Sequence, residues 1–146
     1  MFFERVTTKE QINSYINECI AKKIKIACYN LSKVGEQLVN TARSTDSYKD
    51  QTGNLRSSIG YIVLVDGKIY QMSNFETVSN GSKGSISGKL FANDIIKRFN
   101  IGVVLVVVAG MNYAAYVSAK GYDVIDSAEL LADKLVPKML KQIGFI

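Results

Sequence analysis

The chain has 146 residues, of which 47% are hydrophobic and 21% charged, with a formal net charge of +5. A chain of this length and composition buries a core of its own, which excludes bulk disorder. The sequence has no histidine, which excludes Ser-His-Asp and Cys-His catalysis and the commonest metal ligand. Its two cysteines are too few for a structural zinc site. We therefore expect a protein that is not an enzyme and has no cofactor.

The cysteines and the apolar runs indicate where the protein is made. Cys19 and Cys28 fall on opposite faces of one helix, about 13.5 Å apart along its axis, so no internal disulfide is expected. Residues 1–18 have no continuous apolar run of the kind found in signal peptides. The longest apolar stretch, Ile101–Met111, is shorter than the ~20 residues of a membrane helix. We therefore expect synthesis in a reducing cytoplasm and no membrane association.

A long amphipathic helix is predicted near the N-terminus. Thr7 and Glu10 have the spacing of a capping box, in which each side chain binds a free backbone N–H group. Lys23 falls inside the apolar stripe that follows, so either its charged end extends to solvent or the helix meets water or a partner there. One small sheet cannot cover so long a helix, so we expect one end to project or to pack on another subunit. The stripe consists of Ile12, Ile16, Cys19, Ile20, Ile24, Ala27, Leu31, Val34, Leu38 and Ala42.

A loop and a β-hairpin are predicted after this helix. Residues 45–54 are polar, which is typical of a loop. Ile59–Val65 and Lys68–Ser73 are rich in β-forming residues and flank Asp66-Gly67. An Asp-Gly pair between two strands favours a type I′ turn, because both central residues of that turn adopt positive φ.

The segment Ser73–Gly88 is rich in serine and glycine and has too few apolar residues to form a core. We expect a flexible loop over about residues 73–88, which is either functional or a disordered tip. Gly84–Lys89 is not a phosphate-binding loop, because only three residues separate its glycines and Leu90 follows the lysine. Lys89–Asn100 has the apolar spacing of a short helix.

The C-terminal part predicts one strand and two helices. Ile101–Ala109 is apolar on both faces, which indicates a strand that is central in the sheet or covered on both sides. Asn112–Lys120 has the pattern of a helical turn. In the last helix we expect Asp126 with Glu129 at the N-terminal cap and a kink near Pro137.

This order of elements predicts an α+β fold in a single domain, residues 1–146. A long N-terminal helix and a C-terminal helix are expected to pack on a small, mostly antiparallel sheet that contains the β-hairpin.

Two groups of charged residues have a functional and a structural interpretation. The basic group consists of Lys22, Lys23, Lys25, Lys33, Lys97 and Arg98. These residues could contact a phosphate backbone, but a solvated helix face is favoured because arginine is scarce and no aromatic residues are interleaved for base stacking. The acidic group consists of Asp123, Asp126 and Glu129. Helix capping is favoured over an acidic site, because a helix N-terminus attracts carboxylates.

Two segments carry a resemblance to a known family. Thr52–Ile59 follows the long first helix and enters a strand, and Ala109–Val117 follows the hydrophobic strand. This pair, in this order, resembles the head–tail connector (neck or tail-completion) proteins of long-tailed phages, and the order of elements is similar over about the whole chain. Two positions depart from the family pattern. Ser118 replaces the usual acidic residue, and Tyr122–Ile125 replaces a stretch rich in proline and aromatic residues.

The resemblance implies a structural subunit of an oligomeric ring in the virion neck, made in the host bacterial cytoplasm. Its partners would be further copies of itself, a head-completion or adaptor protein, and a tail terminator or tail tube protein. Non-specific DNA would pass through the lumen, and neither a cofactor nor a catalytic residue is implied. The candidate interface residues are Thr52, Gly53, Asn54, Arg56, Asn80, Gly81, Ser82, Lys83, Gly84, Ser85, Tyr113, Tyr116 and Tyr122.

Alternatives remain open from the residues alone. Arg56 is a buried structural donor, an interface contact or only a surface charge. Tyr113 and Tyr116 lie on one helical face, where core packing is favoured over an interface role. Two other functions also remain. One is a tail terminator or another tail structural protein, and the other is a small basic nucleic-acid-binding protein whose affinity would depend steeply on salt.

Overall fold

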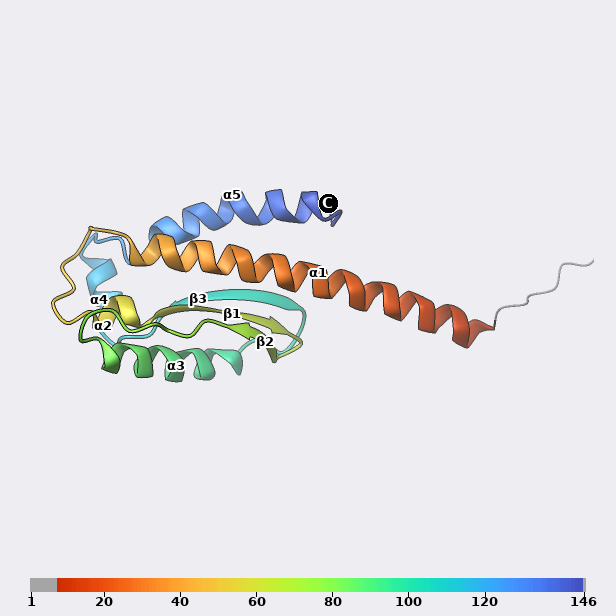
Figure 1. The fold of residues 1–146 in the computed structure, drawn as a ribbon, viewed down its shortest axis with the longest axis horizontal. Coiled ribbons are helices and arrows are strands. Elements are labelled where there is room, and N and C mark those ends of the chain that lie inside the picture. Colours follow the sequence, from red (N-terminus) through yellow and green to blue (C-terminus); the bar gives the residue numbers. More distant parts are fainter. Residues whose placement is uncertain (1–7, 146) are drawn as a thin grey trace, which may run out of the picture.

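The computed structural model describes residues 8–145, which form two helical layers around one sheet. Helices α1 and α5 cover one face of the sheet, and α3 covers the other (Figure 1). This arrangement confirms the predicted α+β fold, with a long N-terminal helix and a C-terminal helix on an antiparallel sheet. The elements are α1 (Lys9–Arg43), α2 (Asn54–Ser57), β1 (Ile59–Val65), β2 (Lys68–Met72), α3 (Ser82–Ile96), β3 (Val103–Ala109), α4 (Ala114–Ala119) and α5 (Asp126–Gln142).

Helix α1 begins at a capping box, one residue later than expected. The Thr8 hydroxyl accepts a bond from the Gln11 N–H at 3.1 Å, and the Gln11 side chain accepts one from the Thr8 N–H at 3.0 Å. The predicted partner Thr7 lies outside the described residues, and Glu10 is a first-turn residue rather than the capping partner. The pairs Thr7/Glu10 and Thr8/Gln11 both have the spacing of a capping box, and the chain uses the second pair.

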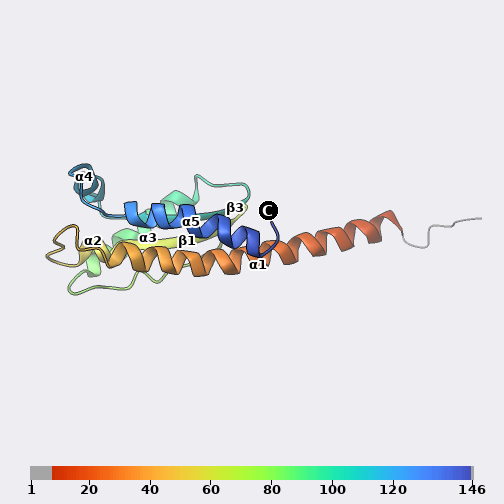
Figure 2. The same cartoon turned by 90° about the horizontal axis from the view of Figure 1, so that it is seen from above.

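Only the C-terminal half of α1 packs on the body of the protein. Its buried residues run from Ala27 to Ala42, whereas the residues before Lys23 are all exposed. The N-terminal half therefore projects beyond the sheet and beyond α5, as Figures 1 and 2 show from two directions. Lys23 stands where the helix leaves the body, with its Nζ 5.9 Å from the centre of the Phe145 ring. The predicted projection of one helix end is thus confirmed.

The sheet has the order β2-β1-β3, and both pairings of β1 are antiparallel. The predicted hairpin is present, with Asp66 at φ 49° and Gly67 at φ 81°, as a type I′ turn requires. Strand β1 is buried on both faces. Ile59 and its alternate neighbours pack against α1, whereas Ile62 and Leu64 pack against α3.

Strand β3 is an edge strand, so of the two alternatives predicted for Ile101–Ala109 the central position is wrong, whereas the apolar cover on both faces is present in part. Ile101 precedes the strand and is 86% exposed. Within β3, Val104 and Val106 pack toward α3, while Leu105 on the opposite face is only partly covered by the helices. An unbroken apolar run indicates that both faces of a strand have apolar surroundings. It does not indicate whether the strand has one hydrogen-bonded neighbour or two.

The serine- and glycine-rich segment is half helical, so a flexible loop over residues 73–88 is wrong for its second half. Helix α3 starts at Ser82 and includes the start of the short helix expected at Lys89–Asn100. Glycines allow α3 to approach its neighbours closely. A Cβ at Gly84 would lie 2.7 Å from the Asn54 Cα, and a Cβ at Gly88 would lie 2.8 Å from the Ser58 carbonyl oxygen. The low apolar content of this segment therefore reflects the glycines that let α3 pack closely on its neighbours.

Helix α5 is capped by a different carboxylate from the one expected. Asp126 is its first residue and makes no side-chain cap, so the predicted Asp126–Glu129 cap is wrong. The Asp123 carboxylate instead accepts bonds from the Ser127 N–H at 3.0 Å and from the Ser127 hydroxyl. These bonds hold the pKa of Asp123 below its usual value. The helix continues through Pro137.

Candidate interaction surfaces

The two segments that carry the family resemblance meet at one end of the sheet. The chain between α1 and α2, together with α4 and the turn after it, surrounds an open hollow of about 870 Å³. We call it the tyrosine hollow. Its lining includes five of the predicted interface residues, namely Thr52, Arg56, Tyr113, Tyr116 and Tyr122. Residues some 60 positions apart in sequence thus share one surface.

Arg56 organises the wall of the tyrosine hollow. Its Nε donates to the Arg43 carbonyl at 3.2 Å, and its Nη2 donates to the Thr45 carbonyl at 2.6 Å and to the Tyr48 carbonyl at 3.5 Å. The guanidinium also lies 4.9 Å from the centre of the Tyr48 ring. Of the three interpretations of Arg56, the structural donor is the one that these contacts support, because one cation satisfies three backbone acceptors at the end of α1.

Asp50 fixes the start of the short helix α2, an element that the sequence did not predict. Its carboxylate accepts bonds from the Arg56 N–H at 2.9 Å and from the Leu55 N–H at 3.4 Å. Gly53 precedes the helix at φ 78°, in the left-handed region that favours glycine. A single turn of this kind has too few residues to produce a periodic signal.

Three tyrosines of the hollow face solvent. Tyr113, Tyr116 and Tyr122 are 37%, 62% and 45% exposed. The expectation that Tyr113 and Tyr116 are core residues is therefore wrong. Tyrosine gives a large contact area with little loss of side-chain entropy, so a cluster of exposed tyrosines suits a protein interface.

Tyr48 lies beneath these residues and is only 8% exposed. Its hydroxyl is buried and has no hydrogen-bond partner among residues 8–145. Burial raises the pKa of Tyr48 to about 12, because an ionised phenolate would lose its hydration. The nearby Arg56 guanidinium opposes this shift but does not cancel it.

We expect the protein to lose stability as the pH rises from about 10 toward 12. Tyr48 and Tyr61 both have a pKa near 12 in the folded protein, against 10.0 ordinarily, so the unfolded chain releases these protons first. The ionisation of these two tyrosines leaves stability unchanged below pH 10 and lowers it above pH 10. Melting temperatures across this range should decline less for Tyr48→Phe than for the wild type. The exposed Tyr116→Phe is the control, and an equal decline in all three proteins would contradict this assignment.

The remaining predicted interface residues are packing residues or lie outside the hollow. The Gly84 N–H donates to the Asn54 side chain at 3.0 Å, and the Ser85 hydroxyl bonds the Thr77 hydroxyl at 2.8 Å. Gly81 is buried. Asn80, Ser82 and Lys83 are exposed around the start of α3 but do not line the tyrosine hollow. This segment is part of the fold, because it contains the first turn of α3.

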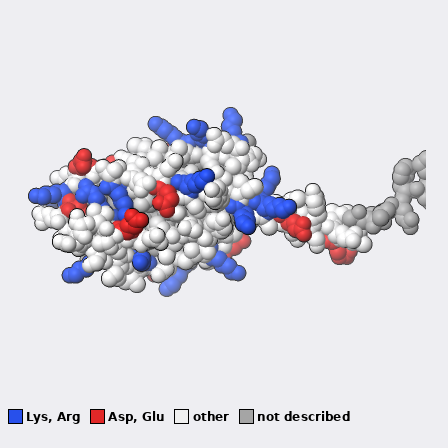
Figure 3. All heavy atoms as spheres, in the orientation of Figure 1, with Lys and Arg blue, Asp and Glu red and all other residues white. Residues whose placement is uncertain are grey.

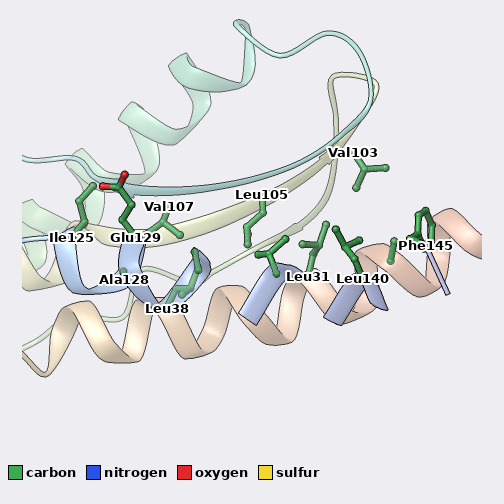
Figure 4. Close-up of a pocket in the computed structure, with 13 residues that line it drawn as sticks. Leu31, Leu38, Val103, Leu105, Val107, Ile125, Ala128, Glu129, Leu140 and Phe145 are labelled. Carbon is green, nitrogen blue, oxygen red and sulfur yellow. The ribbon is translucent and has the colours of Figure 1, made fainter. Parts of the chain in front are cut away.

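A second surface was missed from the sequence. Helix α5 lies on α1 without closing onto β3, which leaves an open groove of about 600 Å³ (Figure 4). We call it the α5–β3 groove. Its floor is α1 with Leu31 and Leu38, one wall is β3 with Leu105, and the other wall is α5 with Ala132 and Val136. The groove has no signal in the sequence, because a periodic apolar pattern does not show whether two apolar faces meet.

A third surface is the projecting part of α1, Lys9–Lys23, which we call the α1 tip. Its large apolar side chains are exposed, with Ile12 at 41%, Tyr15 at 68%, Ile16 at 48% and Ile20 at 51%. Ile12, Ile16 and Ile20 repeat every four residues and so form a continuous stripe. An apolar stripe on a helix is normally buried against another element, and the described part of the chain supplies none here.

No family model matches this chain, and comparisons with curated proteins and with solved structures give no match. Within residues 8–145, no cluster of three or more Cys, Asp or Glu side chains is arranged to hold a metal ion. No helix of that same segment is long and apolar enough to cross a membrane.

Proposed function

We propose that this protein is a structural subunit of an oligomeric ring in the neck of a tailed phage. In that role it joins the head, on the portal or adaptor side, to the tail, and DNA passes through the ring. The observation that carries the proposal is the α1 tip, a helix whose apolar stripe has no partner within the described chain. Such a helix is suited to assembly with other chains.

The tyrosine hollow supports the same proposal. The two segments that resemble neck proteins are separated in sequence but form one surface with three exposed tyrosines. This surface is suited to a head-completion protein or a tail protein as partner, because it combines aromatic area with polar groups at its rim. The α1 tip, the hollow and the α5–β3 groove lie on different parts of the molecule, so one subunit can contact several neighbours at once.

Charge distribution is less consistent with nucleic-acid recognition. Figure 3 shows lysine and arginine side chains dispersed over the face in view, with aspartate and glutamate among them. A DNA-binding surface usually gathers positive charge into one patch or stripe. We therefore propose that any contact with DNA is non-specific and occurs in the lumen of the ring.

Quantitative mass spectrometry of purified particles from the phage or induced prophage tests this function. We expect a few to a dozen copies per particle, in constant ratio to the portal and tail proteins. Absence from intact particles, with the protein abundant in the lysate, would exclude the neck role. Duplex DNA binding that weakens steeply with salt would then favour the nucleic-acid alternative.

A further inference from the structure

The α5–β3 groove has the chemistry of a site for an apolar helix. Its lining is hydrocarbon apart from Glu129, which stands at the end where α5 begins (Figure 4). The wall from α5 consists of residues spaced by four, including Ala128, Ala132 and Val136. Small residues on this wall leave room for large side chains from a partner. Helices bind such grooves through side chains at i, i+4 and i+8.

The α1 tip has the complementary pattern. Ile12, Ile16 and Ile20 form its stripe, and each is between 41% and 51% exposed. The tip has 15 residues and is about 22 Å long, and α5 with 17 residues is about 25 Å long. The stripe and the groove thus have similar lengths. Because α1 is one continuous helix, the tip cannot fold back into the groove of its own subunit.

Charges along the two helices set the direction of docking. Helix α5 begins with acidic residues and ends with basic ones, namely Asp126, Glu129 and Asp133, then Lys134, Lys138 and Lys141. Along the α1 tip and the turn after it, apart from Lys9, the order is likewise Glu10 and Glu18, then Lys22, Lys23 and Lys25. Two helices with the same order of charge attract when they lie antiparallel, because each acidic end then faces a basic end.

We propose that the α1 tip of one copy lies in the α5–β3 groove of the next copy, antiparallel to α5. This inference rests on the proposed function in that it specifies how ring subunits join. Within a subunit α5 runs opposite to α1 (Figure 1), so the incoming tip runs parallel to the α1 that forms the floor. Ile16 of the incoming copy then lies beside the region between Leu31 and Leu38, a shift of roughly 28 Å along the helix axis.

A parallel, shifted contact has a consequence for symmetry. A twofold axis perpendicular to a helix reverses its direction, and a twofold axis along the helix gives no shift. The contact is therefore heterologous, so copies join head to tail and form a closed ring or an open filament. Each copy offers one tip and one groove, and the assembly is not limited to dimers.

Disulfide cross-linking of the full chain tests this contact. Cys19 is an exposed native thiol on the tip, whereas Cys28 is buried. Ala132→Cys adds a thiol to the groove wall. Within one copy these thiols cannot meet, since Cys19 is about 18 Å along the helix from Leu31, which lines the same groove, and a disulfide needs Cα atoms within about 7 Å. Oxidised glutathione should therefore produce a ladder of covalent oligomers from concentrated Ala132→Cys protein.

Three controls make the result specific. The ladder should disappear when Cys19→Ser is added, and Lys134→Cys, on the exposed face of α5, should give none. Ile16→Lys should reduce the yield about tenfold or more, because the contact loses a buried apolar side chain and would have to bury a charge. If Ala132→Cys does not fold, Val136→Cys on the same wall replaces it. Monomers only, or Cys19–Cys19 dimers only, would overturn the proposal.

The two proposals fail separately. A ladder from a protein that is absent from virions would retain the head-to-tail contact and exclude the neck role. A protein present in virions at a constant copy number, but without a ladder, would retain the neck role and exclude this contact.

Discussion

Replacing Gly84 with alanine is expected to lower the free energy of unfolding by about 3 kcal/mol, or roughly 6–12 °C in melting temperature. A Cβ at this position would lie 2.6 Å from the Asn54 carbonyl carbon and closer still to its oxygen. Both are backbone atoms, so no side-chain rotation relieves the clash. Helices α2 and α3 would have to separate, which also breaks the bond from the Gly84 N–H to the Asn54 side chain.

The sign of this effect is diagnostic. In a helix without close neighbours, alanine in place of glycine stabilises by about 1 kcal/mol. Thermal and denaturant unfolding of Gly84→Ala therefore test the packing of α3. A loss of stability indicates close packing on Asn54, and a gain indicates a helix end without close neighbours. Lys83→Ala is the control, because Lys83 is exposed on the adjacent position of the same helix. A stability equal to or above that of the wild type would show that α3 does not approach Asn54 in this way.

Arg56→Lys is expected to destabilise the protein by about 2–3 kcal/mol, although it keeps the positive charge. The guanidinium bonds the Arg43, Thr45 and Tyr48 carbonyls together, and a single ammonium cannot reach acceptors that lie in different directions. The wall of the tyrosine hollow should become mobile as a result. Hydrogen exchange should accelerate over residues 44–53 before it does so elsewhere.

Lys120→Ala is the matched control for Arg56→Lys, because Lys120 also carries a positive charge over a tyrosine ring of the hollow. Its Nζ lies 4.6 Å from the centre of the exposed Tyr116 ring, and among residues 8–145 it donates no hydrogen bond to a backbone carbonyl. We expect a change of at most about 0.5 kcal/mol. If Arg56→Lys were equally mild, the arginine would act as a surface charge, as one of the sequence-based interpretations held.

Elements governed by local chemistry were predictable from the sequence. Strand β1 occupies Ile59–Val65 as expected, because Asp66-Gly67 fixes the turn and the strand is apolar up to it. The apolar stripe of α1 repeats at the helical period over many turns, so its presence and its end near Ala42 were clear. The resemblance of the chain to neck proteins stays a prediction, since no comparison tests it.

Features governed by the proximity of two elements were not predictable. The glycines of α3 were assigned to a flexible loop, because their role depends on Asn54 and Ser58, which lie far away in sequence. The edge position of β3 depends on the absence of a further neighbour. For the candidate surfaces, the sequence singled out Arg56 and the tyrosines of the hollow but favoured a core position for Tyr113 and Tyr116, and it contained no sign of the α5–β3 groove. A groove is a gap between faces that each appear suitable for a core.

The edge position of β3 has a consequence for the behaviour of unassembled copies. Five of its seven residues are valine, none is charged, and its outer backbone groups are unpaired within the described chain. Natural edge strands usually carry lysine, proline or a bulge that prevents intermolecular strand pairing. Overproduced protein without its neighbours is therefore prone to ordered aggregation through Val103–Ala109. Under the proposed neck role, solubility should then depend on how fast each new copy enters the ring, so the cell would need to match synthesis of this chain to synthesis of its partners.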